Sequence, residues 1–365
     1  MKNLKQNLKQ LLNDLCDVVG VSGNEQEIIQ KIVEQIKPYA DEVKVDPVGN
    51  VIAVKKGAKP GPSLLIGAHS DEIGFCVKAI LENGYLLIDK IGNVPDNIML
   101  GRKVWVTAEK IPGVIGTKPG HLQTPEEAAK VSSVNQCYID LGLSSKTEVE
   151  DLGIKIGDPI VIQSDFMEMT NPDIICTKAV DNRMGCSIII ELFKHLNSED
   201  FGGTIYGVFT VREEVGLYGA QTVGHLLQPD YAIALDTIPA GDTPDINTTR
   251  QLPIFLGKGP GFPVADNVGY LFFSFVHPAI REIIEEQAKK LNINLQTCTI
   301  LGATYTTDAS KYSYAGNGIP CATLAIPRRY SHSPIELVNI NDAVDVLKIL
   351  HAIVINNDKA NITFI

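Results

Sequence analysis

The stretch TIYGVFTVREEVGLYGA, residues 204–220, predicts a buried strand that ends on two adjacent carboxylates. Its strand-forming residues, 204–211, lead almost directly into Glu213 and Glu214, and a loop that contains glycine follows. Two negative charges side by side at the end of a buried strand repel each other, unless a cation lies nearby or one glutamate keeps a raised pKa. Either explanation predicts a functional site here rather than a solvated surface.

The segments around this stretch alternate between apolar strands and helices. Strands are expected at 63–69, 231–236 and 321–327, and helices at 183–196, 218–227, 278–292 and within 341–356. Apolar strands separated by helices are typical of a largely parallel sheet that is covered on both faces. The sequence therefore predicts an α/β fold, with a mostly parallel sheet flanked by helices.

Residues 72–167 have a different character and predict an all-β insertion. FCVKAILENGYLLIDKIGN, residues 75–93, reads as two strands around Asn83-Gly84, a strong signal for a hairpin. A short helix is expected at 144–153, where Ser145 and Glu148 form a capping-box pattern. We therefore expect a discontinuous α/β domain, residues 1–71 and 168–365, interrupted by a β-rich domain.

Composition and charge exclude several classes of protein. The net charge of −11 and the pI of about 5.2 argue against a nucleic-acid-binding protein, which needs a basic face. No apolar segment is long enough to cross a membrane, and the first twenty residues predict an amphipathic helix rather than a signal peptide. Seven cysteines without a CxxC pair favour reduced thiols, and hence a cytoplasmic location.

Ionisable residues follow several of the predicted strands. In open α/β sheets, ligands bind beyond the carboxyl ends of the strands, so we expect these side chains to share one rim of the sheet. The candidates, with one aspartate that precedes a predicted helix, are His69, Asp71, Asp181, Glu213, Glu214, Asp236 and His332.

Each candidate also has a purely structural interpretation. A histidine after a strand is more often hydrogen-bonded than a ligand, Asp181 could cap a helix, and Asp236 could close an Asx-turn. Together, however, these groups would form a charge cluster that is costly to bury unless cations neutralise it. Imidazole and carboxylate groups without thiolate suit Zn, Co or Mn.

Two histidines and three carboxylates suffice for two metal ions if one carboxylate bridges them. One of the two adjacent glutamates would then bind metal, and its neighbour would be the general base. Other chemistries fit less well. The sequence has no GxSxG nucleophile elbow, and GKGPG at 257–261 lacks the spacing of a phosphate-binding loop.

The chain resembles the tetrahedral aminopeptidase family, whose members include glutamyl and deblocking aminopeptidases and some proteins called endoglucanases. The resemblance covers nearly the whole chain, and its motifs occur in the family's order. These motifs are GAHSDEIGF (67–75), KAVDNRMGC (178–186), TVREEVGLYGA (210–220), ALDT (234–237) with AGDTP (240–244), and IPRRYSHSPIE (326–336).

This resemblance implies a zinc-peptidase-like fold and a role for each candidate. It implies five metal ligands, with Asp181 bridging the two ions, His69 and Asp236 on one ion, and Glu214 and His332 on the other. Glu213 would be the general base, and Asp71 would orient a ligating histidine. The insertion resembles the family's β-barrel-like dimerisation domain, and dimers in this family assemble into tetrahedral dodecamers.

The sequence departs from the family pattern at two places. Asn182 stands where many relatives have a second aspartate, and GATYTTDAS at 302–310 replaces a more glycine-rich stretch. The second departure affects the pocket for the first residue of the substrate. An acidic preference there would need a basic side chain, for which Arg250, Lys258 and Arg328 are candidates.

We therefore expect an aminopeptidase that uses two divalent metal ions and acts on peptides with a free N-terminus. An N-acyl deacylase is an alternative, because it would share every metal motif. A glycosidase is a second alternative, but it needs two carboxyl groups about 5 to 10 Å apart across a sugar. A non-enzymatic assembly protein is a third, although such a protein has no need to keep Glu213 beside five ligands.

Overall fold

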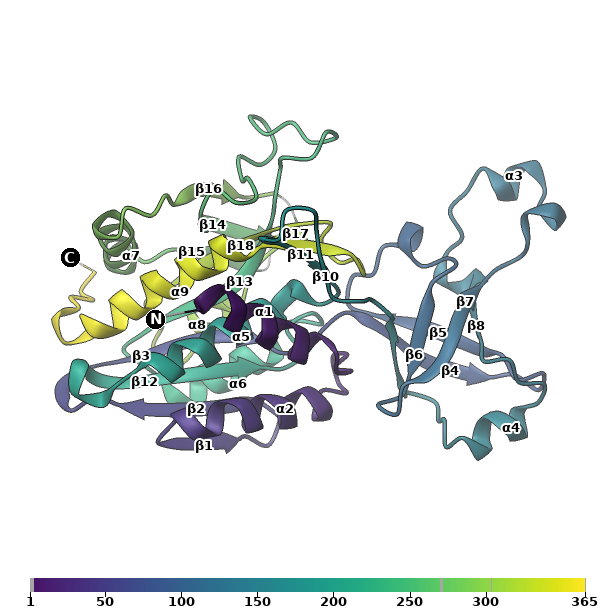
Figure 1. Cartoon of the computed structure of the whole chain (residues 1–365), viewed down its shortest axis with the longest axis horizontal. Helices are drawn as coiled ribbons and strands as arrows, with labels where there is room; N and C mark the ends of the chain where they lie inside the picture. Colours follow the sequence, from purple (N-terminus) through teal and green to yellow (C-terminus); the bar gives the residue numbers. More distant parts are fainter. Residues whose placement is uncertain (1–2, 270–271, 303, 365) are drawn as a thin grey trace.

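The computed structural model describes residues 3–269, 272–302 and 304–364. Figure 1 shows two parts, an α/β part that contains both ends of the chain and a β-rich part at the opposite end of the molecule. Among the described residues, none of the helices combines the length and the hydropathy needed to cross a membrane. The seven cysteines all lie in the described part of the chain, and each is a free thiol.

Parallel strands form the centre of the large sheet, which confirms the predicted α/β fold. They are β12 (Gly202–Thr210), β3 (Lys59–His69), β13 (Tyr231–Pro239) and β18 (Cys321–Arg329), adjacent in this order. In this register Thr210 lies opposite His69, so the loop after β12 begins beside the end of β3.

Antiparallel strands extend the sheet at both edges. One edge consists of β2 (Val51–Lys56) and β1 (Glu42–Val45), and the other of β19 (Glu336–Asn339), β11 (Ile174–Thr177) and β10 (Met167–Glu168). A branch off β18 consists of β14 (Gly261–Val268), β15 (Phe272–Phe275), β16 (Gln296–Ile300) and β17 (Thr304–Tyr305). The sheet is thus mixed, with its parallel strands in the middle.

Helices cover both faces of the sheet. They are α1 (Leu4–Cys16), α2 (Gln26–Ile36), α5 (Val180–His195), α6 (Tyr218–Leu227), α7 (Pro278–Lys290), α8 (Ala309–Tyr312) and α9 (Ile340–Ile355). Alternate residues of β3 face opposite sides. Leu64 and Ile66 pack in the core formed with α1, α5 and α9, whereas Leu65 packs in a second core with α6 and α8. The apolar character of the whole strand therefore reflects burial on both faces.

The β-rich part is a closed barrel with its own hydrophobic core. Its strands, in spatial order, are β4 (Gly74–Ile80), β5 (Leu86–Ile91), β8 (Tyr138–Asp140), β7 (Ile111–Gly116), β6 (Lys103–Val106) and β9 (Pro159–Ile162). The predicted hairpin forms between β4 and β5, with Gly84 at φ 84° in the turn. These strands lie within the predicted insertion, whose independence as a domain stays a prediction.

Two short helices accompany the barrel, α3 (Pro125–Ala128) and α4 (Lys146–Asp151). The capping box predicted at Ser145 is present. The Ser145 side chain accepts a hydrogen bond from the backbone N–H of Glu148, and the Glu148 carboxylate accepts one from the backbone N–H of Ser145.

Candidate active site

The predicted site residues converge at the carboxyl ends of the central strands. His69 is the last residue of β3, Asp236 lies in the second half of β13, and His332 follows β18 by three positions. Glu213 and Glu214 lie in the loop after β12. These five side chains, together with Asp181 in the first turn of α5, line one cavity of about 360 Å³. Asp71 lies outside the lining of this cavity, beside His69.

Two groups of possible metal ligands share the Asp181 carboxylate. One group is His69, Asp181 and Asp236, the other is Asp181, Glu214 and His332, and within each group the donor atoms lie within 4.8 Å of one another. These are the two sets that the family resemblance implies. A third combination, His69 with Glu213 and Glu214, also lies within this distance.

The two oxygens of Asp181 face different histidines. Oδ1 lies 3.1 Å from Nε2 of His69, and Oδ2 lies 3.6 Å from Nε2 of His332. In each set, the second carboxylate also lies close to Nε2 of the histidine of that set. Asp236 Oδ1 lies 3.9 Å from the His69 nitrogen, and Glu214 Oε2 lies 3.4 Å from the His332 nitrogen. A carboxylate placed in this way suits the bridging position between two cations.

Burial and mutual repulsion dominate the electrostatics of the cluster. Burial raises the pKa of Glu214 to about 7 and raises the pKa values of Glu213 and Asp236 well above their usual range. Burial is the largest single effect and works against the charged form of His332, but the Glu214 and Asp181 carboxylates together outweigh it and raise the His332 pKa to about 9. Without metal, the protein therefore favours the protonated forms of these side chains, whereas metal ligands must be deprotonated.

Divalent cations that enter this cluster would displace those protons, as metal ions do when they bind imidazole and carboxylate ligands. The donor set contains imidazole nitrogens and carboxylate oxygens and no thiolate, which is the chemistry that Zn, Co and Mn accept. The residues present thus fit a pair of divalent metal ions.

Asp71 ties the histidine of β3 to the loop that carries the two glutamates. Its carboxylate is fully buried and accepts hydrogen bonds from the backbone N–H groups of Glu213 at 3.1 Å and Glu214 at 3.2 Å. It also accepts one from Ser22 Oγ at 2.6 Å and lies 3.5 Å from Nδ1 of His69. Asp71 is therefore placed to orient His69, the role that the family resemblance implies.

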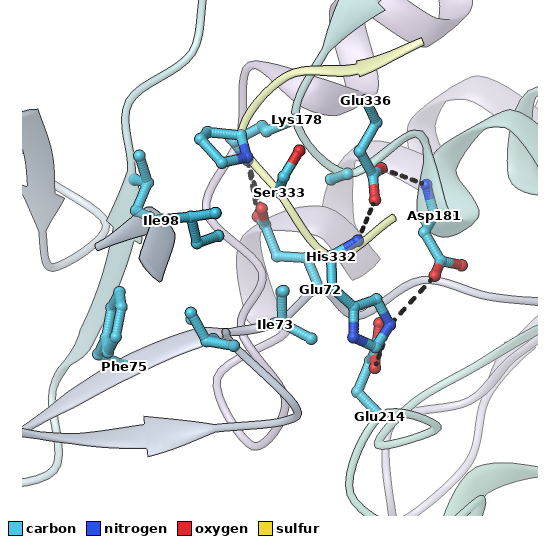
Figure 2. Close-up of a pocket in the computed structure, with 15 residues that line it drawn as sticks. Glu72, Ile73, Phe75, Ile98, Lys178, Asp181, Glu214, His332, Ser333 and Glu336 are labelled. Carbon is cyan, nitrogen blue, oxygen red and sulfur yellow. Dashed lines mark hydrogen bonds and ion pairs between the residues drawn. The ribbon is translucent and has the colours of Figure 1, made fainter. Parts of the chain in front are cut away.

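Two further residues hold the cluster together, and sequence reasoning did not assign them this role. Glu336 accepts hydrogen bonds from the backbone N–H groups of Asp181 at 3.1 Å and His332 at 2.9 Å (Figure 2). Arg328 pairs with Glu336 and, through Nη2, with Asp181 Oδ2 at 2.8 Å. Burial opposes it, but this guanidinium together with His332 and His69 holds the Asp181 pKa well below its usual range. The sequence does contain a signal for Glu336, because it is the last residue of the motif IPRRYSHSPIE, which also contains His332.

The structural alternatives for two candidates are wrong. Asp181 does not cap α5, because Ala179 occupies the N-cap position and Asp181 lies inside the first turn with non-helical backbone angles. Asp236 lies within β13 rather than in a turn after it. Asn182 donates a hydrogen bond to the Leu235 carbonyl oxygen at 2.9 Å and accepts one from the backbone N–H of Gly185. Its side chain joins α5 to β13.

Comparison with known proteins identifies similar chains over nearly the full length. The family model of the M42 glutamyl aminopeptidases matches residues 49–349. A protein of Acetivibrio thermocellus with a provisional aminopeptidase name is 37% identical over 346 residues, which cover 95% of this chain and 98% of that protein. An aminopeptidase from the archaeon Desulfurococcus kamchatkensis superposes with a TM-score of 0.90 at 32% identity, covering 99% of this chain and 97% of the other.

A second similar structure is that of the Pyrococcus horikoshii TET1 peptidase, which can assemble into a tetrahedron or a large octahedral shell. Its TM-score is 0.82 at 31% identity, and the match covers 95% of this chain and 99% of that one.

Proposed function

The chain belongs to the M42 glutamyl aminopeptidase family, and on this premise we propose that it removes N-terminal residues from peptides at a site for two divalent metal ions. The observation that carries the proposal is the pair of ligand groups that share Asp181, inside a cavity that Glu213 also lines. We propose His69, Asp181 and Asp236 for one ion, and Asp181, Glu214 and His332 for the other. Zn, Co and Mn all suit these ligands.

Bound in these positions, two divalent ions supply Lewis-acid activation of a water molecule and of the scissile carbonyl. Glu213 takes a proton from the attacking water and returns it to the leaving nitrogen of the first peptide bond. Its position supports this role, because Oε2 lies 3.9 Å from Nε2 of His69 and Glu213 belongs to neither group that shares Asp181. Asp71 orients His69, and Arg328 with Glu336 orients Asp181.

We also propose that the protein assembles into dimers, and the dimers into a dodecamer, through the barrel. The similarity to a peptidase that assembles into a tetrahedral shell supports this proposal. The segment between β7 and β8 adds physical support, because its apolar side chains Leu122 and Val131 are 67% and 58% exposed. Exposed apolar side chains that gather on one surface mark it as a candidate for contact with another protein. A cytoplasmic location stays part of the proposal, and the free thiols favour it.

The proposed function is tested with two matched peptides on protein from which metal has been removed. One peptide has a free amino terminus, and the other is the same peptide with an N-acetyl group; Zn, Co or Mn is then added back. We expect release of the first residue from the free peptide alone, and only after metal is added. Attack on the acetylated peptide alone would indicate a deacylase, and no cleavage of either peptide with metal bound would contradict an enzymatic role.

A further inference from the structure

Two cavities border the proposed metal ligands, and they differ greatly in size. The first is the cavity of about 360 Å³ that contains both ligand groups. The second, shown in Figure 2, is also lined by His332, and Phe75 and Ile98 of the barrel form an apolar wall. Its free volume is about 40 Å³, far less than that of the first cavity. We therefore assign the first residue of a substrate to the larger cavity.

Apart from the proposed catalytic groups, the described wall of the larger cavity consists mainly of uncharged residues. Leu217 comes from the loop after β12, Val268 from β14, and Thr304, Tyr305 and Thr306 from β17 and its end. Some of these polar groups are already in use. The Tyr305 hydroxyl donates to the Thr237 carbonyl oxygen at 3.0 Å, and the Thr306 hydroxyl donates to Asp266 at 3.1 Å.

The described wall of the larger cavity has no unpaired basic side chain that could bind an acidic substrate. Arg328 is its one basic residue other than histidine, and its guanidinium is 4% exposed and bound to both Asp181 and Glu336. The other two basic candidates from the sequence, Arg250 and Lys258, are solvent-exposed and do not line the cavity. Residues 270, 271 and 303, which lie outside the description, are Tyr, Leu and Ala and carry no charge at neutral pH.

The described wall of the larger cavity also has no carboxylate available to pair with a basic substrate side chain. Its carboxylates are Asp181, Glu213, Glu214 and Asp236, which the proposed function uses as metal ligands and general base. Asp266 is not part of this wall. It is 1% exposed and accepts a hydrogen bond from the Thr306 hydroxyl. A charged side chain that enters the cavity would lose its hydration without gaining a partner, which strongly disfavours its binding.

We propose that this cavity selects peptides whose first residue has an uncharged, mainly aliphatic side chain, and that it rejects acidic and basic first residues. This inference rests on the proposed function, and it adds the class of substrate that the site accepts. Each additional methylene group that the substrate buries against Leu217, Val268 and Tyr305 should raise kcat/KM roughly three- to fourfold.

The test uses the metal-loaded enzyme and a set of aminoacyl p-nitroanilides that share one leaving group. We expect kcat/KM for the Leu and Met substrates to exceed that for the Glu and Lys substrates by roughly 100-fold. A preference for Glu or Lys would overturn the proposed selectivity but not the aminopeptidase function. No cleavage of any substrate with metal bound would overturn both.

Two opposite substitutions at one wall position sharpen the test. Thr304 is exposed and lines the cavity, so Thr304→Lys should raise the Glu-to-Leu ratio of kcat/KM at least about tenfold, and Thr304→Glu should raise the Lys-to-Leu ratio. Val268→Lys serves as a second variant from the adjacent strand. Leu301→Lys is the control, because Leu301 is exposed and lies three residues away, outside the wall. Unchanged ratios in both Thr304 variants and in Val268→Lys would contradict the assignment of this wall.

Discussion

Glu213 and Glu214 are neighbours in sequence, but their side chains approach different histidines. Glu214 Oε2 lies 3.4 Å from Nε2 of His332, whereas Glu213 Oε2 lies 3.9 Å from Nε2 of His69. Both backbone N–H groups donate to the Asp71 carboxylate, which fixes the loop at the end of β12. The two charges at the end of the strand thus serve different positions in the cluster, and this arrangement supports a ligand and a base side by side.

Glu336 provides a prediction at the level of one residue. It accepts hydrogen bonds from the N–H groups of two proposed ligand residues, Asp181 and His332, without being in either ligand group. Glu336→Gln removes the negative charge of this acceptor and one of the two carboxylate partners of Arg328, so we expect the affinity for metal to fall about 10- to 100-fold. Isothermal titration of the metal-free protein with Zn measures this change. We also expect the free energy of unfolding in urea to fall by about 3 to 5 kcal/mol.

The matched control is Glu285→Gln, which makes the same chemical change in an exposed ion pair with Arg281. That variant should lose at most about 1 kcal/mol of unfolding free energy and should bind metal like the natural protein. Equal metal affinities in the two variants would contradict the positioning role of Glu336.

At the level of elements, much of the site could be predicted because parallel strands bring their carboxyl ends to one edge. The polar residues at or near the ends of β3, β12 and β13 could therefore be grouped from sequence order alone. The register agrees with this expectation, since Thr210 at the end of β12 lies opposite His69 at the end of β3. Asp181, which precedes the main part of α5, joins the same group.

What could not be predicted depends on pairing between distant segments. The contacts of Glu336 require the turn that joins β18 to β19, where Arg328 pairs with Val338 in antiparallel register. The wall of the cavity depends on β17 pairing with β14. The family resemblance draws attention to residues 302–310 around β17, but no pattern in the sequence indicates β14 as its partner. Single-sequence patterns predict that a strand exists, but they do not predict its neighbour. For this reason Arg328 was a candidate for binding acidic substrates until its two carboxylate partners were known.

At the scale of the whole molecule, the barrel contributes to the site as well as to its own core. The loop after β5 carries Asn93, which lines the larger cavity, and its carbonyl oxygen lies 3.1 Å from Nδ1 of His332. A hydrogen bond at Nδ1 leaves Nε2 of His332 free to bind the metal ion that we propose there. The barrel and the α/β part therefore form one functional unit.

The proposed assembly gives a second prediction at this scale. Light scattering at micromolar concentration should show a particle several times larger than the 39.6 kDa chain. The double variant Leu122→Asp, Val131→Asp places charges on exposed apolar side chains of the barrel, and we expect it to yield smaller species. Leu226→Asp makes a similar change at an exposed position of α6, and this variant should keep the particle mass of the natural protein. A natural protein that is monomeric would contradict the assembly.

The central claim, a glutamate base beside two metal ions, is tested most directly by comparing Glu213→Gln with Glu214→Gln. For each variant, the metal content per subunit and kcat on a free peptide are measured together. We predict that Glu213→Gln keeps both metal ions and loses turnover by about 10²- to 10⁴-fold, because it removes the general base. Glu214→Gln should lose metal as well as activity. Natural turnover in Glu213→Gln, or loss of metal from that variant, would contradict the claim.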